Sequence, residues 1–355
     1  MPRVPVCYHT GMNRDAAPGP ATEPYPLFVL GAPRSGTKLL RALLNNHPDV
    51  SLGNEGNFVP RLVKQFGLGA DLTRPEAQRE LYRAFSRAEY VRSAAARDGV
   101  GLSEDDFLGA LEARRAGGLP LDWAAALEVL LRPYGPRPAA PVFGDKSHGY
   151  INDVALVRAV LPSVRFVFLV RDPRDQALSA RVAWGRHPLR SAHLWAGNAR
   201  KAAEAGLAVA ADTLTVRYED LTDDPEGELR RVCAFLGVPY VAAMAHLQRP
   251  VEREKQGRQL KTVVTQQARY RGGLEPRLIR GVTAITLPYL GAYGYPDEGV
   301  TEGRTLSPLR LRLLGYTDGF STLLFHVRRK GLVAGSRYYL KRHLEARAGS
   351  AERPR

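Results

Sequence analysis

Leu27-Phe-Val-Leu-Gly-Ala-Pro-Arg-Ser-Gly-Thr-Lys-Leu-Leu-Arg41 is the stretch of sequence that decides the fold. It holds an apolar run, then a loop with two glycines, then apolar residues at helical spacing. A strand that leads through a tight loop into a helix is the layout of a phosphate site, because the N–H groups of the first helical turn point at an anion. Arg34 and Lys38 add positive charge. The segment therefore predicts a site for a nucleotide phosphate.

This loop differs from the phosphate loop of ATP-dependent enzymes. Gly31 and Gly36 have the spacing of the motif G-x-x-x-x-G-K-[ST]. Lys38 comes one place late, however, and Leu39 follows it where that motif has a hydroxyl for Mg²⁺. An ATP-dependent kinase would lose a central metal ligand in this arrangement. A turn that binds nothing is the other alternative, and the charges of Arg34 and Lys38 argue against it, because they repel each other without an anion.

The sequence P-R-S-G-T-x-L-L, which starts at Pro33, resembles the 5′-phosphosulfate loop of the sulfotransferases, in particular of their bacterial, carbohydrate-directed and tyrosyl-directed branches. That family takes a sulfuryl group from 3′-phosphoadenosine 5′-phosphosulfate (PAPS) and needs no metal. The resemblance implies PAPS as co-substrate and a hydroxyl-bearing acceptor. It also implies that the loop residues contact the co-substrate, namely Arg34, Ser35, Gly36, Thr37, Lys38 and Leu39.

A second motif, Arg171-Asp-Pro-Arg-Asp-Gln-Ala-Leu-Ser179, follows the most strand-like run in the chain, residues 164–170. Ligands of open α/β sheets bind beyond the carboxyl ends of strands, where an arginine can hold a phosphate with two hydrogen bonds. The motif resembles the 3′-phosphate motif of the sulfotransferases, which implies that Arg171 and Ser179 hold the 3′-phosphate of PAPS. Helix capping and ion pairing are the alternative, and we expect that structural role for Arg174 and Asp175.

Sulfuryl transfer needs a base beside the acceptor hydroxyl and cations beside the leaving phosphate. By resemblance, Glu55 is the catalytic base and Lys146 supports the transferring group, while Lys38 can neutralise the leaving group. The residues after Lys146 are Ser147 and His148, which depart from the family pattern. His148 is therefore an alternative base, and a solvated turn carboxylate is the alternative for Glu55.

Three further residues are assigned to the nucleotide by looser resemblance. Tyr218, in Tyr-Glu-Asp-Leu, matches a tyrosine that reaches the cofactor, although a core aromatic would also fit. Arg269 and Tyr270 lie where the family often has residues that cover the nucleotide, and a basic surface loop is the alternative. No Cys/His cluster has the spacing of metal ligands, so we expect no metal.

Alternating strands and helices predict an α/β fold with a doubly wound parallel sheet of the P-loop NTPase-like type and helices on both faces. Helical spacing from about 74 to 131 predicts a helical insertion beside the site. The expected strands are residues 27–30, 142–143, 164–170 and 213–218, with a turn or short strand at 52–57. The expected helices are residues 35–45, 152–161, 173–184, 192–205 and 225–236.

The composition of the chain limits the class of protein and its expected cellular location. The chain has 355 residues, 44% of them hydrophobic, and a net charge of +15, which suits a globular protein with an anionic ligand. Its two cysteines, Cys7 and Cys233, make no disulfide framework. No apolar run has the length of a signal peptide core or a membrane span, and we expect a cytoplasmic protein, or one peripheral at a membrane. We expect a flexible arm over residues 1–24, a sulfotransferase domain over 25–300 and a basic amphipathic segment over 301–355.

The last segment carries much of the charge. From Arg304 to Arg355 there are twelve Lys/Arg and three Asp/Glu, with aromatic residues between the basic ones. Residues 304–345 could lie on an anionic membrane, or pack as a helix with a basic face or as a homodimer contact. Nucleic acid is not expected as a partner, because no reader motif is present.

The sequence as a whole predicts a PAPS-dependent sulfotransferase that acts on a hydroxyl of a carbohydrate, glycolipid, peptide tyrosine or small metabolite. An ATP-dependent P-loop kinase and a non-catalytic nucleotide-binding module are the alternatives. The first would require Mg·ATP, and the second would bind nucleotide without turnover.

Overall fold

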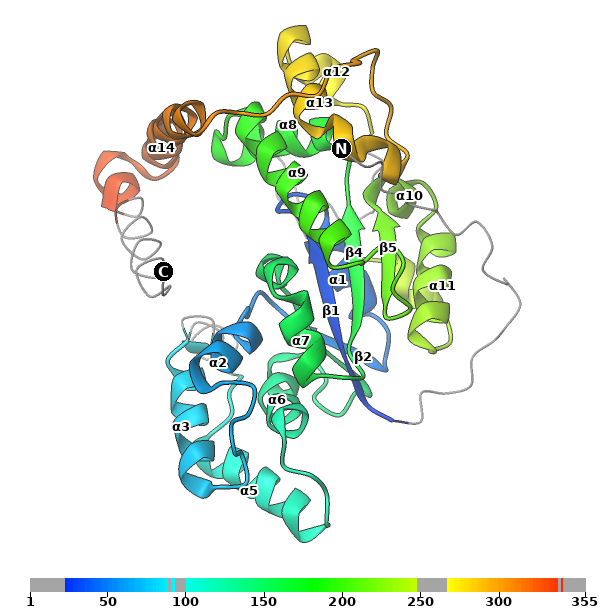
Figure 1. Cartoon of the computed structure of the whole chain (residues 1–355), viewed down its shortest axis with the longest axis vertical. Coiled ribbons are helices and arrows are strands. Elements are labelled where there is room, and N and C mark those ends of the chain that lie inside the picture. Colours follow the sequence, from blue (N-terminus) through cyan, green and yellow to red (C-terminus); the bar gives the residue numbers. More distant parts are fainter. Residues whose placement is uncertain (1–22, 89–90, 93–99, 248–266, 338–339, 341–355) are drawn as a thin grey trace. The chain divides into compact units, whose positions relative to one another are not determined.

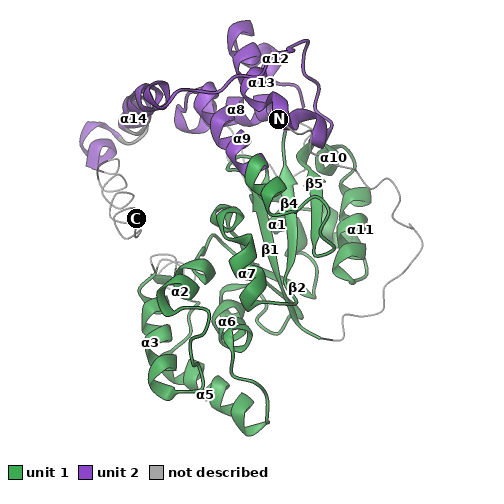
Figure 2. Cartoon of the chain, in the orientation of Figure 1, with its two compact units in different colours: residues 1–171, 200–266 green, residues 172–199, 267–355 purple. Residues whose placement is uncertain are grey.

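The structure is a computed structural model that describes residues 23–88, 91–92, 100–247, 267–337 and 340 (Figure 1). The chain forms two compact units, coloured separately in Figure 2. The first unit comprises residues 1–171 and 200–266, and the second comprises residues 172–199 and 267–355. Almost all of the expected N-terminal arm, and the end of the basic segment, lie outside the described residues.

The first unit is built on a five-stranded parallel sheet with the strand order β2-β3-β1-β4-β5. Its central strand, β1, pairs with β3 on one side and β4 on the other, so that Leu27 lies between Gly144 and Arg165. All residues of this strand are buried, as expected of a parallel strand covered on both faces. The strands are β1 (Tyr25–Gly31), β2 (Val50–Gly53), β3 (Val142–Lys146), β4 (Arg165–Val170) and β5 (Thr213–Arg217).

Helices cover both faces of the sheet. On one face, Leu43 of α1 (Thr37–Leu44) and Leu229 of α11 (Pro225–Leu236) share a core with Val29 and its neighbours. On the other face, the ring of Phe28 meets the ring of Tyr150 at 4.6 Å between centroids. The predicted fold class is thereby confirmed: a doubly wound parallel sheet of the P-loop type. The loops that follow β1, β3 and β4 lie at its carboxyl edge, where such sheets bind ligands.

The observed helix ends agree with the predicted ends where a capping residue is present in the sequence. Helix α11 has the predicted bounds because Asp224 caps its N-terminus, with the Asp224 side chain accepting from Gly227 N at 2.9 Å, and Gly237 ends it at a φ of 68°. The insertion is helical as predicted, with α3 (Pro75–Ser86), α5 (Glu104–Ala116) and α6 (Trp123–Leu131). The remaining elements of the unit are α2 (Val59–Phe66), η1 (Arg132–Tyr134), η2 (His148–Asn152), α7 (Val154–Val160), α10 (Tyr218–Asp223) and η3 (Ala242–Ala245).

The second unit is helical and has its own core. Its elements are α8 (Pro173–Trp184), α9 (Pro188–Glu204, whose last five residues belong to the first unit), α12 (Tyr270–Gly273), α13 (Pro276–Leu290), η4 (Gly291–Tyr293) and α14 (Pro308–Lys330). The core joins Ala177 of α8, Leu189 of α9 and Val282 of α13. Within the part of the chain that is described, no helix combines the length and the apolar character needed to cross a membrane.

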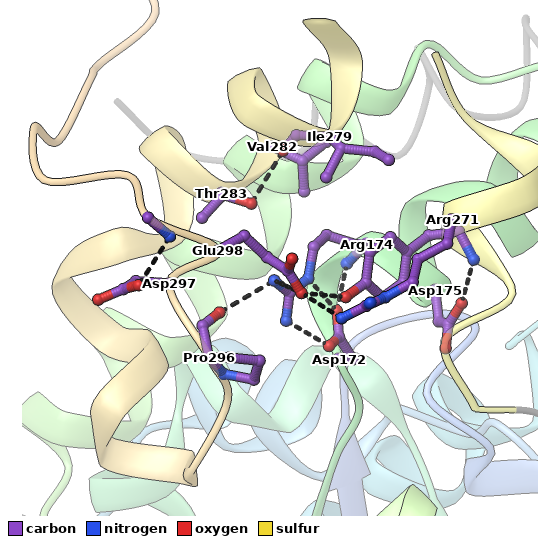
Figure 3. Close-up of polar contacts among 12 residues, drawn as sticks. Asp172, Arg174, Asp175, Arg271, Ile279, Val282, Thr283, Pro296, Asp297 and Glu298 are labelled. Atoms are coloured by element: carbon purple, nitrogen blue, oxygen red, sulfur yellow. Dashed lines mark hydrogen bonds and ion pairs between the residues drawn. The ribbon is translucent and has the colours of Figure 1, made fainter. Parts of the chain in front are cut away.

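Arg174 organises the polar interior of the second unit, as Figure 3 shows. Its fully buried guanidinium donates from Nε and Nη2 to the two Asp172 carboxylate oxygens, at 2.8 and 2.6 Å, and from Nη1 to Pro296 O at 2.9 Å. Asp172 also caps α8 by accepting from Arg174 N at 2.8 Å. Asp175 accepts from Tyr270 N at 2.8 Å. The ion pair predicted for Arg174 is present, with Asp172 as its partner, whereas Asp175 accepts from the backbone N–H of Tyr270 and does not cap α8.

Candidate functional site

The loop between β1 and α1 has the backbone of a phosphate cradle. Arg34 and Gly36 both have positive φ, 74° and 97°, and Gly36 is the residue before the first turn of α1. A Cβ at Gly36 would lie 2.3 Å from a ring carbon of Tyr218, so only glycine fits. The Ser35 side chain is fully buried, and within the described residues its hydroxyl has no hydrogen-bond partner. A buried hydroxyl beside the open N–H groups of a helix suits an anion.

Tyr218 and Arg171 line this loop. The Arg171 guanidinium carbon lies 4.1 Å from the centre of the Tyr218 ring, and Arg171 Nη1 donates to Arg34 O at 3.3 Å. Both side chains are buried and belong to the first unit. Tyr218 is therefore a buried aromatic residue whose ring packs directly on Gly36 of the loop, and its contact with a cofactor stays a prediction.

Glu55, Lys146 and His148 form a polar cluster within the first unit. Lys146 Nζ donates to Glu55 Oε1, and His148 Nε2 lies 3.2 Å from the same oxygen. The Lys146 side chain is fully buried, whereas half of the Glu55 side chain is exposed. The described residues make no hydrogen bond to Glu55 Oε2. One carboxylate oxygen is thus held by two donors, and the other is open to an incoming hydroxyl.

Both ring nitrogens of His148 have partners in this arrangement. Its Nδ1 lies 2.6 Å from Gly31 O, which can only accept, so Nδ1 donates. Its Nε2 lies 3.2 Å from Glu55 Oε1. Neither ring nitrogen is left without a partner. This geometry favours Glu55 over His148 as the base, and makes His148 a link between the phosphate loop and Glu55.

The pKa values of the cluster follow from its contacts. The pKa of Glu55 falls to about 2, mainly because His148 hydrogen-bonds to it and also because Lys146 does, against the effect of burial. Burial lowers the pKa of Lys146, and the positive charges of Lys38 and Arg41 lower it further, while Glu55 raises it. Glu55 and Lys146 are in direct contact, and the charge of Lys38 acts on Lys146 from the phosphate loop.

A second layer holds the Glu55 loop. Ser147 Oγ accepts from Gly56 N at 3.1 Å and from Asn57 N at 3.0 Å, and these are the two residues after Glu55. Asp145, two residues before Ser147, accepts from Tyr150 OH at 3.0 Å. Burial raises the pKa of Asp145 to about 7, against the lowering effects of Ser147, Tyr150 and Lys146.

We predict that Asp145 makes stability depend on pH. The folded protein loses this proton near pH 7, whereas the unfolded chain loses it near pH 3.8, so the folded state alone holds it between these values. Stability therefore falls as the pH rises through this window, by up to about 4 kcal/mol. Asp145→Asn, which keeps the shape without a charge, should flatten the dependence and be the more stable protein above pH 7.

Urea unfolding at pH 5 and pH 8 checks this prediction. Exposed Asp105→Asn is the matched control and should keep the wild-type dependence. An Asp145→Asn protein with the same pH dependence as wild type would show that Asp145 is ionised throughout.

Three predicted contacts belong to the second unit and stay predictions. Ser179 lies in α8, and Arg269 and Tyr270 lie at the start of α12. Tyr270 is 3% exposed, and its hydroxyl donates to Glu298 Oε1 at 2.6 Å. Arg174 lies 4.7 Å from the centre of this ring. These contacts give Tyr270 a structural place within its own unit.

Asp145 and Ser147 have clear structural roles at the site, but none was assigned to them from the sequence. Asp145 and Ser147 are polar but 2% and 1% exposed; Asp145 lies at the end of β3 and Ser147 directly after it. Consecutive polar residues at the end of a buried strand are the signal that could have found them, because such groups are buried only with partners. Across the described ranges, no group of three or more His, Cys, Asp or Glu side chains could hold a metal ion.

Comparisons with known proteins agree on one family. A family model described as "Sulfotransferase family" matches residues 26–242. Protein-tyrosine sulfotransferase 1 of Danio rerio is 26% identical over 227 residues, which cover 62% of this chain and 55% of that protein. Nodulation protein NoeE of Sinorhizobium fredii is 28% identical over 249 residues, which cover 64% of this chain and 52% of that protein. The chain spans about half the length of these curated relatives.

A comparison with solved structures also found matches. The sulfotransferase domain of the Synechococcus PCC 7002 olefin synthase has a TM-score of 0.43 and 21% identity, over 83% of this chain and 94% of that one. Mouse sulfotransferase SULT7A1, complexed with PAP, has a TM-score of 0.39 and 13% identity, over 84% of this chain and 89% of that one.

The range matched by the family model contains the phosphate loop, the Glu55 cluster, Arg171 and Tyr218. The match covers more than half of the chain. The chain belongs to the sulfotransferase family, a family of transferase enzymes.

Proposed function

We propose that this protein transfers the sulfuryl group of PAPS to a hydroxyl group of an acceptor, with Glu55 as the base. The observation that carries the proposal is the Glu55 cluster beside the phosphate loop: one carboxylate oxygen held by Lys146 and His148, the other open. The buried Ser35 hydroxyl and the first turn of α1 suit the 5′-phosphosulfate.

The reaction balances with the groups that the cluster supplies. Glu55 takes the proton of the acceptor hydroxyl while the new oxygen–sulfur bond forms. The bond between the sulfur and the bridging phosphate oxygen breaks, and 3′-phosphoadenosine 5′-phosphate (PAP) leaves. Lys38 and Lys146 neutralise the charge that grows on the bridging oxygen. His148 orients the carboxylate by donating to it.

The acid strength of Glu55 changes in this scheme. With Lys146 and His148 on Oε1, the pKa of Glu55 is about 2, and the group is a weak base. When Lys146 Nζ donates to the transferring group instead of Glu55 Oε1, Glu55 loses one of the hydrogen bonds that lower its pKa. Glu55 is therefore a stronger base when the donor is in place than in the empty site.

For the nucleotide, we propose that Arg171 and Ser179 hold the 3′-phosphate, and that Tyr218, Arg269 and Tyr270 contact or cover the rest. Support for Arg171 comes from its place against Tyr218 at the phosphate loop. The acceptor is proposed to be a hydroxyl of a carbohydrate, glycolipid, peptide tyrosine or small metabolite. Relatives named protein-tyrosine sulfotransferases favour testing a phenolic hydroxyl first. A cytoplasmic location and a homodimer are further proposals from the sequence.

Purified full-length protein tests the proposed activity. We expect it to convert PAPS to PAP without Mg²⁺ and to label at least one acceptor from a panel of tyrosine peptides, oligosaccharides and phenols. Transfer that strictly requires Mg·ATP would support the kinase alternative instead. Tight PAP binding with no turnover on the whole panel would support a non-catalytic nucleotide-binding module.

We predict that Ser147→Ala slows transfer without weakening nucleotide binding. The change leaves the Gly56 and Asn57 N–H groups without their acceptor, so the Glu55 loop loses its anchor. We expect kcat to fall by about tenfold and stability by about 1 kcal/mol, because Gly56 is only partly buried and Asn57 is exposed, so water can replace part of the lost contact. Ser147→Thr, which keeps the hydroxyl, should restore most of kcat. A raised Kd for PAP with unchanged kcat would contradict this role for Ser147.

A further inference from the structure

Helix α14 carries a stripe of large apolar side chains exposed to solvent. Leu309, Leu313, Tyr316, Phe320 and Leu324 are 69, 56, 78, 68 and 38% exposed. Their spacing of three and four residues places them on one face of the helix. A soluble monomer rarely exposes so continuous an apolar surface, so this face needs a partner. These five residues are called the α14 stripe below.

The α14 stripe is not the face by which the helix packs on its own unit. Leu311 and Leu314, on the opposite side, pack against the core of the second unit. Asp318 is 5% exposed and accepts from His187 N at 2.7 Å and from Arg190 Nη1 at 2.8 Å. With 3.6 residues per turn, these positions lie across the helix from the α14 stripe. Helix α14 therefore packs on its own unit through this side, and the α14 stripe is a separate, exposed face.

The charges beside the α14 stripe are all positive. Arg310 and Arg328 are exposed along one edge of it and Arg312 along the other. Asp318 is the only acidic residue of α14, and it is buried in the contact with Arg190. In the next turns, Leu332 and Val333 are 73 and 79% exposed. The apolar face lies between arginines, and α14 has no exposed acidic residue. Such a face complements a surface that is apolar inside and anionic outside.

Charge decides between two occupants of this face. A second copy of the chain would bring identical arginine edges together, and no exposed carboxylate on α14 would compensate them. An anionic bilayer supplies phosphates at the depth of the arginines and acyl chains at the depth of the stripe. Tyr316 suits the boundary, because its ring is apolar and its hydroxyl is polar.

We propose that α14 lies flat on an anionic membrane, with the α14 stripe toward the acyl chains and Arg310, Arg312 and Arg328 at the lipid phosphates. The contact is peripheral and depends on both apolar burial and charge. It requires neither PAPS nor catalysis, so it stands apart from the proposed function.

Co-sedimentation of the full-length protein with vesicles tests the proposal. We expect binding to phosphatidylcholine vesicles that contain about 30% phosphatidylglycerol, with little binding to phosphatidylcholine alone. Raising NaCl from about 0.1 M to about 0.5 M should weaken binding several-fold. The double variant Leu313→Ser/Phe320→Ser should bind at least about tenfold more weakly. Each of Arg310→Gln and Arg312→Gln should lower the affinity about fivefold.

A matched control separates the stripe from general hydrophobicity. Leu119→Ser and Val209→Ser alter apolar residues of the first unit that are 52 and 68% exposed, and should bind vesicles like wild type. Circular dichroism checks that each variant is folded.

Three results would overturn the proposal. The wild-type protein could fail to bind anionic vesicles. The stripe variant could bind as well as wild type. Light scattering without lipid could find a dimer that the stripe variant converts to a monomer, which would make this face a contact between two copies.

Discussion

Glu55→Gln should lower kcat for sulfuryl transfer by about 10²- to 10⁴-fold, the range that removal of a general base produces. Glutamine keeps the size of the side chain and can still accept from Lys146 and His148, so the loop should keep its position. PAP should bind as well as to wild type or more tightly, because a negative charge near an anion site is removed. Steady-state kinetics and PAP titration together measure both effects.

The matched control for this change is Glu112→Gln, a carboxylate that is 60% exposed on α5. It should keep wild-type kinetics. Full activity of Glu55→Gln would remove Glu55 as the base, and a large loss of activity in His148→Gln alone would then point to the histidine.

Lys146→Met should lower kcat/KM by about 10²- to 10³-fold, because a fully buried cation beside the transferring group is replaced by an uncharged chain of similar length. The fold should survive the change, since the partner, Glu55, is half exposed and water can solvate it. Lys64→Met, on a lysine that is 60% exposed, is the control.

The double variant Glu55→Gln/Lys146→Met separates two roles of Lys146. If the lysine stabilises the leaving group itself, the double variant is slower than Glu55→Gln alone. If Lys146 acts only by holding Glu55, the double variant equals Glu55→Gln, and this result would falsify a catalytic role for Lys146.

Much of the sheet could be predicted because its signals are local. The apolar run that ends at Gly31 gave β1, and the Asp-Pro starts and Gly ends gave the bounds of α8 and α11. The second unit could not be predicted, because its core joins residues far apart in sequence, such as Leu189 and Val282. Neither the segment around Leu189 nor the segment around Val282 has a local sequence pattern that predicts its contact with the other.

The candidate site residues could be named from the sequence, but their contacts could not. Glu55 and Lys146 were named by resemblance, and they lie 91 residues apart in sequence. Ser147 and His148 looked like departures from the family pattern. In the structure they hold the Glu55 loop and the Glu55 carboxylate, which depends on the distance between two loops that no sequence spacing reveals.

The central proposal is that the nucleotide is held at both ends. Lys38 and its loop hold the 5′-phosphate, and Arg171, beside Tyr218, holds the 3′-phosphate. Calorimetric titration of the wild-type protein with PAP and with ADP, each with and without Mg²⁺, tests this most directly. PAP should bind without Mg²⁺ and at least about tenfold more tightly than ADP, because ADP lacks the phosphate for Arg171. Equal affinity for the two nucleotides, or binding of ADP only with Mg²⁺, would contradict the account.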